Sequence, residues 1–355
     1  MNDLFKNFSK NNESLFLNEH MLSYDYQPKL VPHRENQQHF IASCIKPLFE
    51  KRSGKNLFIF GQPGIGKTVS LVHVLNELNE KTDEIETIYI NCWKKDSSHK
   101  MAIEICHQLG YKFTHNKGTD ELFEEIKTRL NKKSAVIVLD EVDKLSDFQT
   151  IYNLLEDIYR KCIFFITNDK KFLISLDARL KSRLSLSELE FKPYNYEQTK
   201  DILNERKKYA FVKDAFSQDA FEIIAKKSYE VQDIRTGLFL LQESGNIAEE
   251  KSSKKITLEH SQEAVSRLKN YKIKSPLELD EEEKEIVELI KNNVNKDILQ
   301  IYEEYKKKND KSIRTFQRKI KELAKNKIIF LDEAVSKKGG KTYNLRYVDK
   351  KLVEF

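Results

Sequence analysis

The chain has 355 residues, of which 39% are hydrophobic, and it carries a formal net charge of +6. This length exceeds one ordinary domain and the apolar content excludes wholesale disorder, so two or three folded domains are expected. No apolar run approaches the roughly 18 residues that span a bilayer, and the polar N-terminus is not typical of a signal peptide. The four cysteines have no metal-binding or redox spacing, which indicates reduced thiols in a cytoplasmic protein.

The first 27 residues are polar and irregular, and we expect a mobile lead-in there. Residues 28–193 alternate between two patterns. Apolar runs suited to buried parallel strands lie at residues 57–60, 88–91, 135–139 and 163–167. Segments with helical periodicity lie at residues 39–50, 68–80, 99–109, 120–131 and 151–160. The alternation predicts an α/β domain with a doubly wound parallel sheet, whose ligands bind at the carboxyl ends of the strands.

A glycine-rich loop follows the first predicted strand. Residues 61–68 read Gly-Gln-Pro-Gly-Ile-Gly-Lys-Thr and fit the phosphate-loop pattern G-x-x-x-x-G-K-[ST] at every fixed position, between a strand and a helix. The glycines let backbone N–H groups close on phosphate oxygens, the lysine reaches the outer phosphates, and the threonine hydroxyl binds Mg²⁺. The residues predicted to contact a nucleoside triphosphate are Gly61, Gln62, Pro63, Gly64, Ile65, Gly66, Lys67, Thr68 and Val69.

Two later strands end in polar side chains. One ends in Asp140 and Glu141, where the first carboxylate would hold Mg²⁺ through water and the second would polarise the attacking water. The other ends at Asn168, whose amide would position this water or contact the terminal phosphate. Acid pairs are common on surfaces, and Asn168 also suits a turn. A position about 70 residues after a phosphate loop nevertheless favours a catalytic nucleotide site.

Residues 194–275 contain helical patterns only, at residues 196–208, 217–229, 231–250 and 258–269. Ser217 and Thr257 are candidate N-caps, because a hydroxyl accepts a hydrogen bond from the first turn of a helix. These patterns predict a small all-helical domain. Residues 271–279 include Pro276 and are typical of a linker.

Residues 280–355 are predicted to form a further domain. Asp280 would cap a first helix with an acidic first turn, a second helix covers residues 296–307, and a third begins at Ser312. Residues 328–331 and 342–347 are typical of two strands, with the turn at residues 337–341. Three helices and a β-hairpin predict a winged helix-turn-helix, whose third helix enters a DNA major groove.

The charge distribution agrees with a polyanionic partner. Residues 306–355 hold 16 Lys/Arg and 6 Asp/Glu, a balance of +10 that leaves −4 for the rest of the chain. Arginine and glutamine read base edges, and lysine pairs with phosphate, so double-stranded DNA is the predicted partner. The candidate contacts are Arg314, Thr315, Gln317, Arg318, Lys319, Lys321 and Lys325 on the third helix and Lys338, Gly339, Gly340 and Lys341 at the wing. A solvated face on a domain that binds protein is the alternative.

Together these motifs resemble the AAA+ ATPases and, within them, the archaeal replication initiators that merge origin-recognition-complex and cell-division-cycle roles. The resemblance covers most of the chain. Besides the phosphate loop it lies in residues 30–35 (adenine box), 139–145 (Walker B), 166–169 (sensor 1), 176–184 (box VII), 193–206 (lid box) and 233–235 (sensor 2). Two departures are the bulky pair Phe164 and Phe165, and residues 170–176, which are short for the DNA-contacting insertion of that family.

The resemblance implies ATP or ADP with Mg²⁺ as ligands and roles for further residues. Arg34, Tyr194 and Arg206 would border the base and the phosphates, and Arg235 would reach the terminal phosphate from the lid. Arg183 would be the finger that completes the site of a neighbouring subunit, with Arg179 as its rival.

The resemblance also implies a function: an ATP-regulated initiator that binds origin DNA, recruits the replicative MCM helicase and hydrolyses ATP slowly as a switch. Self-association, association with other initiator subunits and a place in the nucleoid would follow. A clamp-loader-type subunit is one alternative, although that class lacks a terminal winged domain. The other is a regulatory or mobile-element AAA+ ATPase whose winged domain binds protein or acts as a latch.

Overall fold

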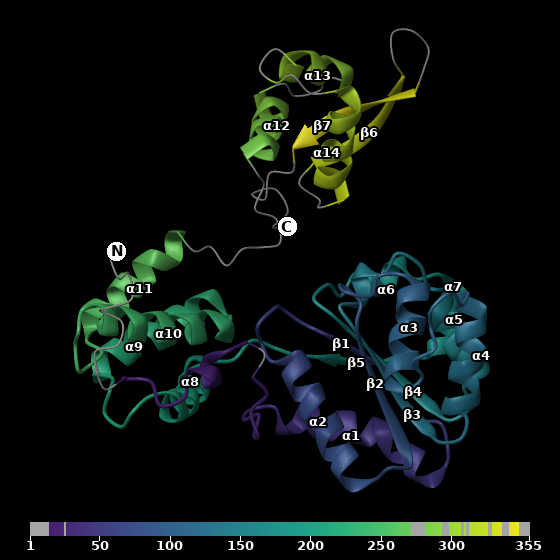
Figure 1. Ribbon diagram of the computed structural model, residues 1–355, viewed down its shortest axis with the longest axis horizontal. Helices are drawn as coiled ribbons and strands as arrows, with labels where there is room; N and C mark the ends of the chain where they lie inside the picture. The colour runs from purple at the N-terminus through teal and green to yellow at the C-terminus, as the bar shows by residue number, and fades with distance from the viewer. Residues whose placement is uncertain are drawn as a thin grey trace, which may run out of the picture. The chain divides into compact units, whose positions relative to one another are not determined.

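The computed structural model describes residues 14–24, 26–270, 281–292, 298–306, 309, 312–325, 329–335 and 341–347. The chain divides into two compact units, Met1–Asn270 and Tyr271–Phe355 (Figure 1). Within the described ranges, no helix is long and apolar enough to cross a membrane.

A five-stranded parallel sheet forms the centre of the first unit. Its order is β2-β3-β4-β1-β5, with β1 at Leu57–Phe60, β2 at Ile85–Asn91, β3 at Ser134–Asp140, β4 at Lys161–Thr167 and β5 at Ser187–Glu190. The predicted doubly wound sheet is therefore confirmed. The edge strand β5 was missed, because its sequence Ser-Glu-Leu-Glu is half exposed and carries no apolar run.

Helices cover both faces of this sheet (Figure 1). Side chains alternate along β1, so that Phe58 and Phe60 join one apolar cluster while Leu57 and Ile59 join the other. One face is covered by α3 (Ser98–Gln108), α4 (Thr119–Leu130), α5 (Gln149–Asp157), α6 (Phe172–Ser175) and α7 (Ala178–Leu184), and the other by α1 (Glu35–Ile45), η2 (Lys46–Glu50) and α2 (Lys67–Lys81).

A helical lid follows the sheet in the same unit. It consists of α8 (Tyr196–Ala210), α9 (Gln218–Val231), α10 (Ile234–Glu250) and α11 (Leu258–Asn270). Asn195 and Gln198 form a reciprocal capping box at the start of α8. The Ser217 side chain accepts a hydrogen bond from the Ala220 N–H, which confirms the N-cap predicted for α9.

The stretch of residues 14–24 differs from the mobile lead-in that we expected. Leu15 and Leu22 are buried in the lid core, and the Phe16 ring lies 4.7 Å from that of Phe211. The Leu17 N–H donates to the carbonyl oxygen of Ala210 at 2.8 Å. Burial of these apolar side chains offsets the entropy of ordering the segment. We call residues 14–24 the strap.

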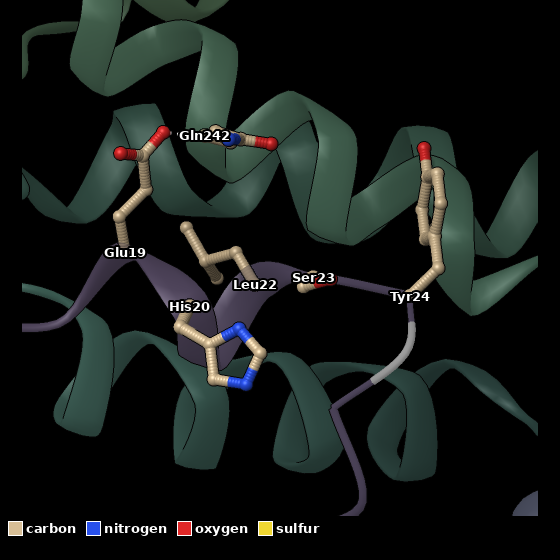
Figure 2. A pocket seen from close by; sticks show the side chains of 6 residues that line it. All are labelled: Glu19, His20, Leu22, Ser23, Tyr24 and Gln242. Carbon is tan, nitrogen blue, oxygen red and sulfur yellow. Dashed lines mark hydrogen bonds between the residues drawn. The ribbon is translucent and has the colours of Figure 1, made fainter.

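The strap includes a short 3-10 helix, η1 (Glu19–Leu22), beside α10. Figure 2 shows the pocket between them, where Gln242 of α10 donates to Glu19 at 2.6 Å and the Tyr24 ring stands against the helix. The strap thus belongs structurally to the lid, although it precedes the sheet domain in the sequence.

The second unit contains three described helices and an antiparallel strand pair. These are α12 (Glu281–Asn292), α13 (Ile298–Lys306), α14 (Ile313–Lys325), β6 (Ile329–Val335) and β7 (Lys341–Tyr347), with Leu331 opposite Leu345. Its buried side chains include Ile286, Ile290, Ile301, Tyr305, Phe316, Ile320 and Leu345. The predicted cap Asp280 and the wing residues Lys338, Gly339 and Gly340 lie outside the described residues.

Gly245 provides a test of the strap. A glycine-to-alanine change inside a helix normally stabilises it by about 1 kcal/mol. Here the added Cβ would lie 2.4 Å from Phe16 Cζ and 2.8 Å from Phe211 Cε1, so Gly245→Ala should instead destabilise the lid by about 1–3 kcal/mol in urea unfolding. Asn246→Ala, one residue along α10, is the control and should be neutral or slightly stabilising. Equal stability of the two variants would show that the strap does not pack there.

Candidate functional site

The loop between β1 and α2 needs glycine at three positions. Gly61, Gly64 and Gly66 have φ values of 148°, 73° and 88°, a region that side chains with a Cβ rarely adopt. Two of these glycines also leave room for lid residues. A Cβ on Gly64 would lie 1.9 Å from Asp233 Oδ1, and one on Gly66 would lie 2.7 Å from the Tyr194 hydroxyl. The loop is therefore in direct contact with the lid.

Lys67 is a buried cation, with 7% of its surface exposed. Its ammonium group donates to the carbonyl oxygens of Gly61 (2.8 Å) and Gln62 (2.7 Å) and to Asn168 Oδ1 (2.8 Å). Burial lowers the pKa of Lys67 to about 8, although the Asp140 carboxylate opposes this shift. The ammonium group thus lies among neutral acceptors, which an anionic ligand can replace.

The Asp140 carboxylate, at the end of β3, accepts three hydrogen bonds. Its Oδ2 accepts from Thr68 Oγ1 and from the Tyr89 hydroxyl, both at 2.7 Å, and its Oδ1 accepts from the Glu141 N–H at 2.9 Å. Burial and the Asp140 carboxylate raise the pKa of Tyr89, which keeps its hydroxyl a donor. Tyr89 was not among the predicted site residues. The available signal was its place on a strand that pairs with β3 two residues before Asn91, the partner of Asp140.

Glu141 lies next to this cluster in the left-handed region, with φ 54°. Burial raises its pKa, and the neighbouring carboxylates of Asp140 and Asp143 raise it further. Asp143 itself accepts a hydrogen bond from Thr167 Oγ1 at 2.8 Å, which ties the segment after β3 to the end of β4. The sheet register thus brings the predicted residues Thr68, Asp140, Glu141 and Asn168 to one edge.

The start of α10 contacts the phosphate-loop sequence directly. The Ile234 N–H donates to the carbonyl oxygen of Gly64 at 3.2 Å. Arg235 forms an ion pair with Asp233 at 2.7 Å, and its charge influences the pKa values of Lys67 and Glu141. Arg235 therefore lies within electrostatic range of Lys67 and Glu141, and its contact with a terminal phosphate stays a prediction.

Arg34 connects the loop to the base of the lid. It is 4% exposed, and its guanidinium group stacks 3.8 Å from the Tyr194 ring centroid. Its Nη2 donates to the carbonyl oxygens of Ile65 (2.9 Å) and Lys192 (2.8 Å). Two of the residues predicted to border the nucleotide thus contact each other beside the loop.

Arg206 lies elsewhere, on the strap side of the lid. Its Nη1 donates to the Met21 carbonyl at 3.3 Å, and its guanidinium carbon lies 4.7 Å from the Tyr26 ring centroid. Burial lowers its pKa. The Gln27 amide next to this contact donates to the carbonyl oxygen of Val69 at 2.8 Å. Among the described residues, the Arg206 side chain thus contacts Met21 and Tyr26 and makes no hydrogen bond or ion pair with the loop.

The two candidate finger residues lie on α7. Arg183 pairs with Glu156 of α5, and the carbonyl oxygen of the next residue, Leu184, accepts from Asn56 Nδ2. Asn56 directly precedes β1, so this end of α7 lies at the amino ends of the strands, opposite the phosphate-loop edge. Arg179 is exposed one helical turn earlier.

The third helix of the second unit, α14, separates apolar from basic residues. Phe316, Ile320 and Leu323 are buried. Arg314, Arg318 and Lys321 are exposed, and Thr315, Gln317 and Lys319 are half-buried. The side chains of Lys325 and Lys341 lie outside the description, although Lys341 begins β7.

Two family models match this chain: an AAA domain over residues 51–176 and a Cdc6 AAA+ ATPase-type lid domain over residues 200–266. The ORC1-type DNA replication protein 1 of Archaeoglobus fulgidus is 32% identical over 270 residues, 72% of this chain and 66% of that protein. The ORC1-type DNA replication protein 1 of Sulfurisphaera tokodaii is 34% identical over 279 residues, 74% of this chain and 70% of that protein. The chain thus spans about two thirds of the length of these relatives.

Solved structures share the fold. The Aeropyrum pernix ORC1 protein in complex with DNA has a TM-score of 0.74 at 25% identity, over 96% of each chain. The Cdc6p of Pyrobaculum aerophilum has a TM-score of 0.65 at 20% identity, over 93% of this chain and 94% of that one.

The pKa of Lys67 can be tested through stability. Between pH 8 and 10.5 the unfolded chain holds this proton more tightly than the folded chain, so folding stability gains from Lys67 as pH rises through that window. The gain is up to about 3 kcal/mol, since each pKa unit corresponds to about 1.4 kcal/mol. We expect the unfolding free energy of the unsubstituted chain, minus that of Lys67→Met, to increase from pH 8 to 10 in nucleotide-free urea titrations. A constant difference would contradict the depressed pKa.

Proposed function

Because this chain belongs to the ORC1-type DNA replication proteins, the archaeal Orc1/Cdc6 family of AAA+ ATPases, we propose that it is an ATP-regulated initiator that binds origin DNA. The observation that carries the ATP part is the convergence of Lys67, Thr68, Asp140, Glu141 and Asn168 at one edge of the sheet. The DNA complex of the Aeropyrum pernix ORC1 protein supports the DNA part.

ATP or ADP fits the loop on charge and shape. The loop ends at the N-terminus of the long helix α2, whose dipole and first N–H groups favour an anion. Phosphate oxygens would take over the Lys67 ammonium group from the carbonyl oxygens of Gly61 and Gln62. Arg34 and Tyr194 would border the nucleotide and hold the segment that joins the loop to the lid. Arg206 would border the nucleotide from the strap side of the lid.

Mg²⁺ fits beside the phosphates. The Thr68 hydroxyl would bind the ion, and the Asp140 carboxylate, which accepts a hydrogen bond from Thr68 Oγ1 at 2.7 Å, would hold it through water. These two side chains suffice, since Mg²⁺ usually keeps several waters and phosphate ligands. The bound ion would neutralise charge on the phosphates. Tyr89 would hold the Asp140 carboxylate in this orientation.

We assign slow ATP hydrolysis to the same edge, as a switch between two states of the lid. Glu141 would accept a hydrogen bond from the attacking water as the general base. Asn168 would position this water or the terminal phosphate while it contacts Lys67. Arg235 would sense the terminal phosphate from the lid.

Arg183 and Arg179 would serve the site of a neighbouring subunit, because α7 ends at the opposite edge of the sheet from its own loop. The Arg183–Glu156 pair is exposed, and such pairs contribute little stability. The Arg179 guanidinium forms no hydrogen bond or ion pair with any residue the structure describes. A self-assembled form, or an assembly with other initiator subunits, would thus find both arginines available.

The second unit would bind double-stranded DNA as a winged helix-turn-helix. Its helix α14 would enter the major groove through Arg314, Arg318 and Lys321, with Thr315, Gln317 and Lys319 at the margin. The wing residues Lys338, Gly339, Gly340 and Lys341 would contact the backbone or minor groove. Recruitment of the replicative MCM helicase and a place in the nucleoid complete the proposal.

The nucleotide site makes a clear prediction. Lys67→Ala should weaken binding of a fluorescent ATP analogue by more than about 100-fold, because a desolvated charge-assisted contact is lost. Glu141→Gln should keep this affinity and lower phosphate release by about 100-fold or more. Unchanged ATP affinity in Lys67→Ala would remove the nucleotide proposal.

The basic face of α14 allows a second prediction, on DNA binding. Arg314→Ala/Arg318→Ala should weaken duplex binding by at least about tenfold and lower the salt slope by about 2, one for each lost phosphate or base contact. Lys213→Ala/Lys226→Ala removes two exposed lid cations and is the charge-matched control in gel-shift titrations. Equal DNA affinity of the two variants would favour the latch or protein-binding alternative for the second unit.

A further inference from the structure

The carboxylate of Asp233 lies between two parts of the site. It is 13% exposed and packs against the Cα of Gly64, where an added Cβ would lie 1.9 Å from Oδ1 and 2.6 Å from Oδ2. On its other side it accepts from Arg235 Nε at 3.1 and 3.2 Å and from Nη2 at 2.7 Å. A negative charge thus lies beside a loop that is suited to bind phosphate.

Asp233 also has an ordinary structural role, which has to be separated from any other. It is the N-cap of α10, and its Oδ1 accepts from the Arg235 N–H at 2.8 Å. Asparagine and serine are N-caps of similar strength to aspartate. They retain this hydrogen bond and remove the charge.

We propose that Asp233 is a positioning residue that competes with the terminal phosphate of ATP for Arg235, and so sets how strongly the site prefers ATP over ADP. The inference rests on the proposed nucleotide site. One guanidinium group faces two anions that cannot both hold it in the same bidentate geometry. ADP lacks the terminal phosphate, so it would leave the Asp233–Arg235 pair in place.

The charges around Arg235 agree with this competition. Besides Asp233, Arg235 interacts electrostatically with Tyr24 of the strap and with Glu141. Its charge also depresses the pKa of Lys67. A terminal phosphate near Lys67 would therefore draw Arg235 away from Asp233. After hydrolysis the carboxylate would take the guanidinium group back, which returns the start of α10 to the position seen here.

The strap lies where a displacement of Arg235 from Asp233 would change its surroundings. Tyr24 lies close enough to the Arg235–Asp233 pair for both charges to act on its hydroxyl. Tyr24 also lines the pocket against α10 (Figure 2). A displacement of the Arg235 guanidinium group would thus change the electrostatic environment of Tyr24 in the strap as well as that of the loop.

The test measures ATP and ADP affinities of the full chain by titration calorimetry with Mg²⁺. Asp233→Asn should raise the ratio of ATP to ADP affinity by about 3- to 5-fold, the range expected for release of a partly exposed ion pair. Arg235→Ala should lower the ratio. In the Arg235→Ala background, Asp233→Asn should leave the ratio unchanged, because its effect acts through Arg235. Asp233→Ser repeats the test with a second neutral cap.

Two controls separate the outcomes. Asp177 is also an aspartate N-cap, at α7, and Asp177→Asn should not alter the ratio. The inference is overturned if Asp233→Asn and Asp233→Ser leave the ratio unchanged or lower it while the unsubstituted chain binds both nucleotides. It is also overturned if Asp233→Asn changes the ratio equally in the Arg235→Ala background. Failure of the unsubstituted chain to bind either nucleotide would overturn the proposed function together with the inference.

Discussion

The arrangement of the site depends on the hydrogen bonds of the buried Lys67 ammonium group. Its acceptors come from the loop after β1 and from Asn168 after β4, two strands that are neighbours in the sheet. Taking an ammonium group out of water is unfavourable unless oxygen acceptors surround it. Burial of this ammonium group therefore requires both the loop conformation and the β1–β4 pairing, which supply its acceptors. The same burial depresses the pKa of Lys67.

The lid contacts this loop at several points. Asp233 and Ile234 touch Gly64, and the stacked pair Arg34–Tyr194 spans from Ile65 to Lys192. A second connection lies nearby: Leu15 and Leu22 of the strap are buried in the lid core, and the Gln27 amide donates to the carbonyl oxygen of Val69 on α2. A change in the ligand at the loop would thus act on the lid directly, through packed contacts and hydrogen bonds.

Several elements could be predicted from the sequence because their burial gives a regular pattern of apolar residues. β1, β3 and β4 are buried along most of their length and read as apolar runs, and the lid helices show the period of an amphipathic helix. The strand β5 and the short helices α6 and α7 were not predicted, because their few residues carry too little periodicity. The strap was not predicted either, because Leu15 and Phe16 are apolar residues within a polar stretch, and they pack on a surface formed about two hundred residues later.

The sequence by itself determined the chemistry that is available: a glycine loop with its lysine and threonine, an acid pair at a strand end, an amide at the next strand end and a basic C-terminal segment. These are local patterns, since each depends on residue types at short spacing. Only the tertiary structure decided the partners of each group. Strand order brought Tyr89 to Asp140, and lid packing placed Asp233 on Gly64. Contacts with Met21 and Tyr26 placed the Arg206 side chain on the strap side of the lid. Such pairings join residues far apart in the chain, and no local pattern encodes them.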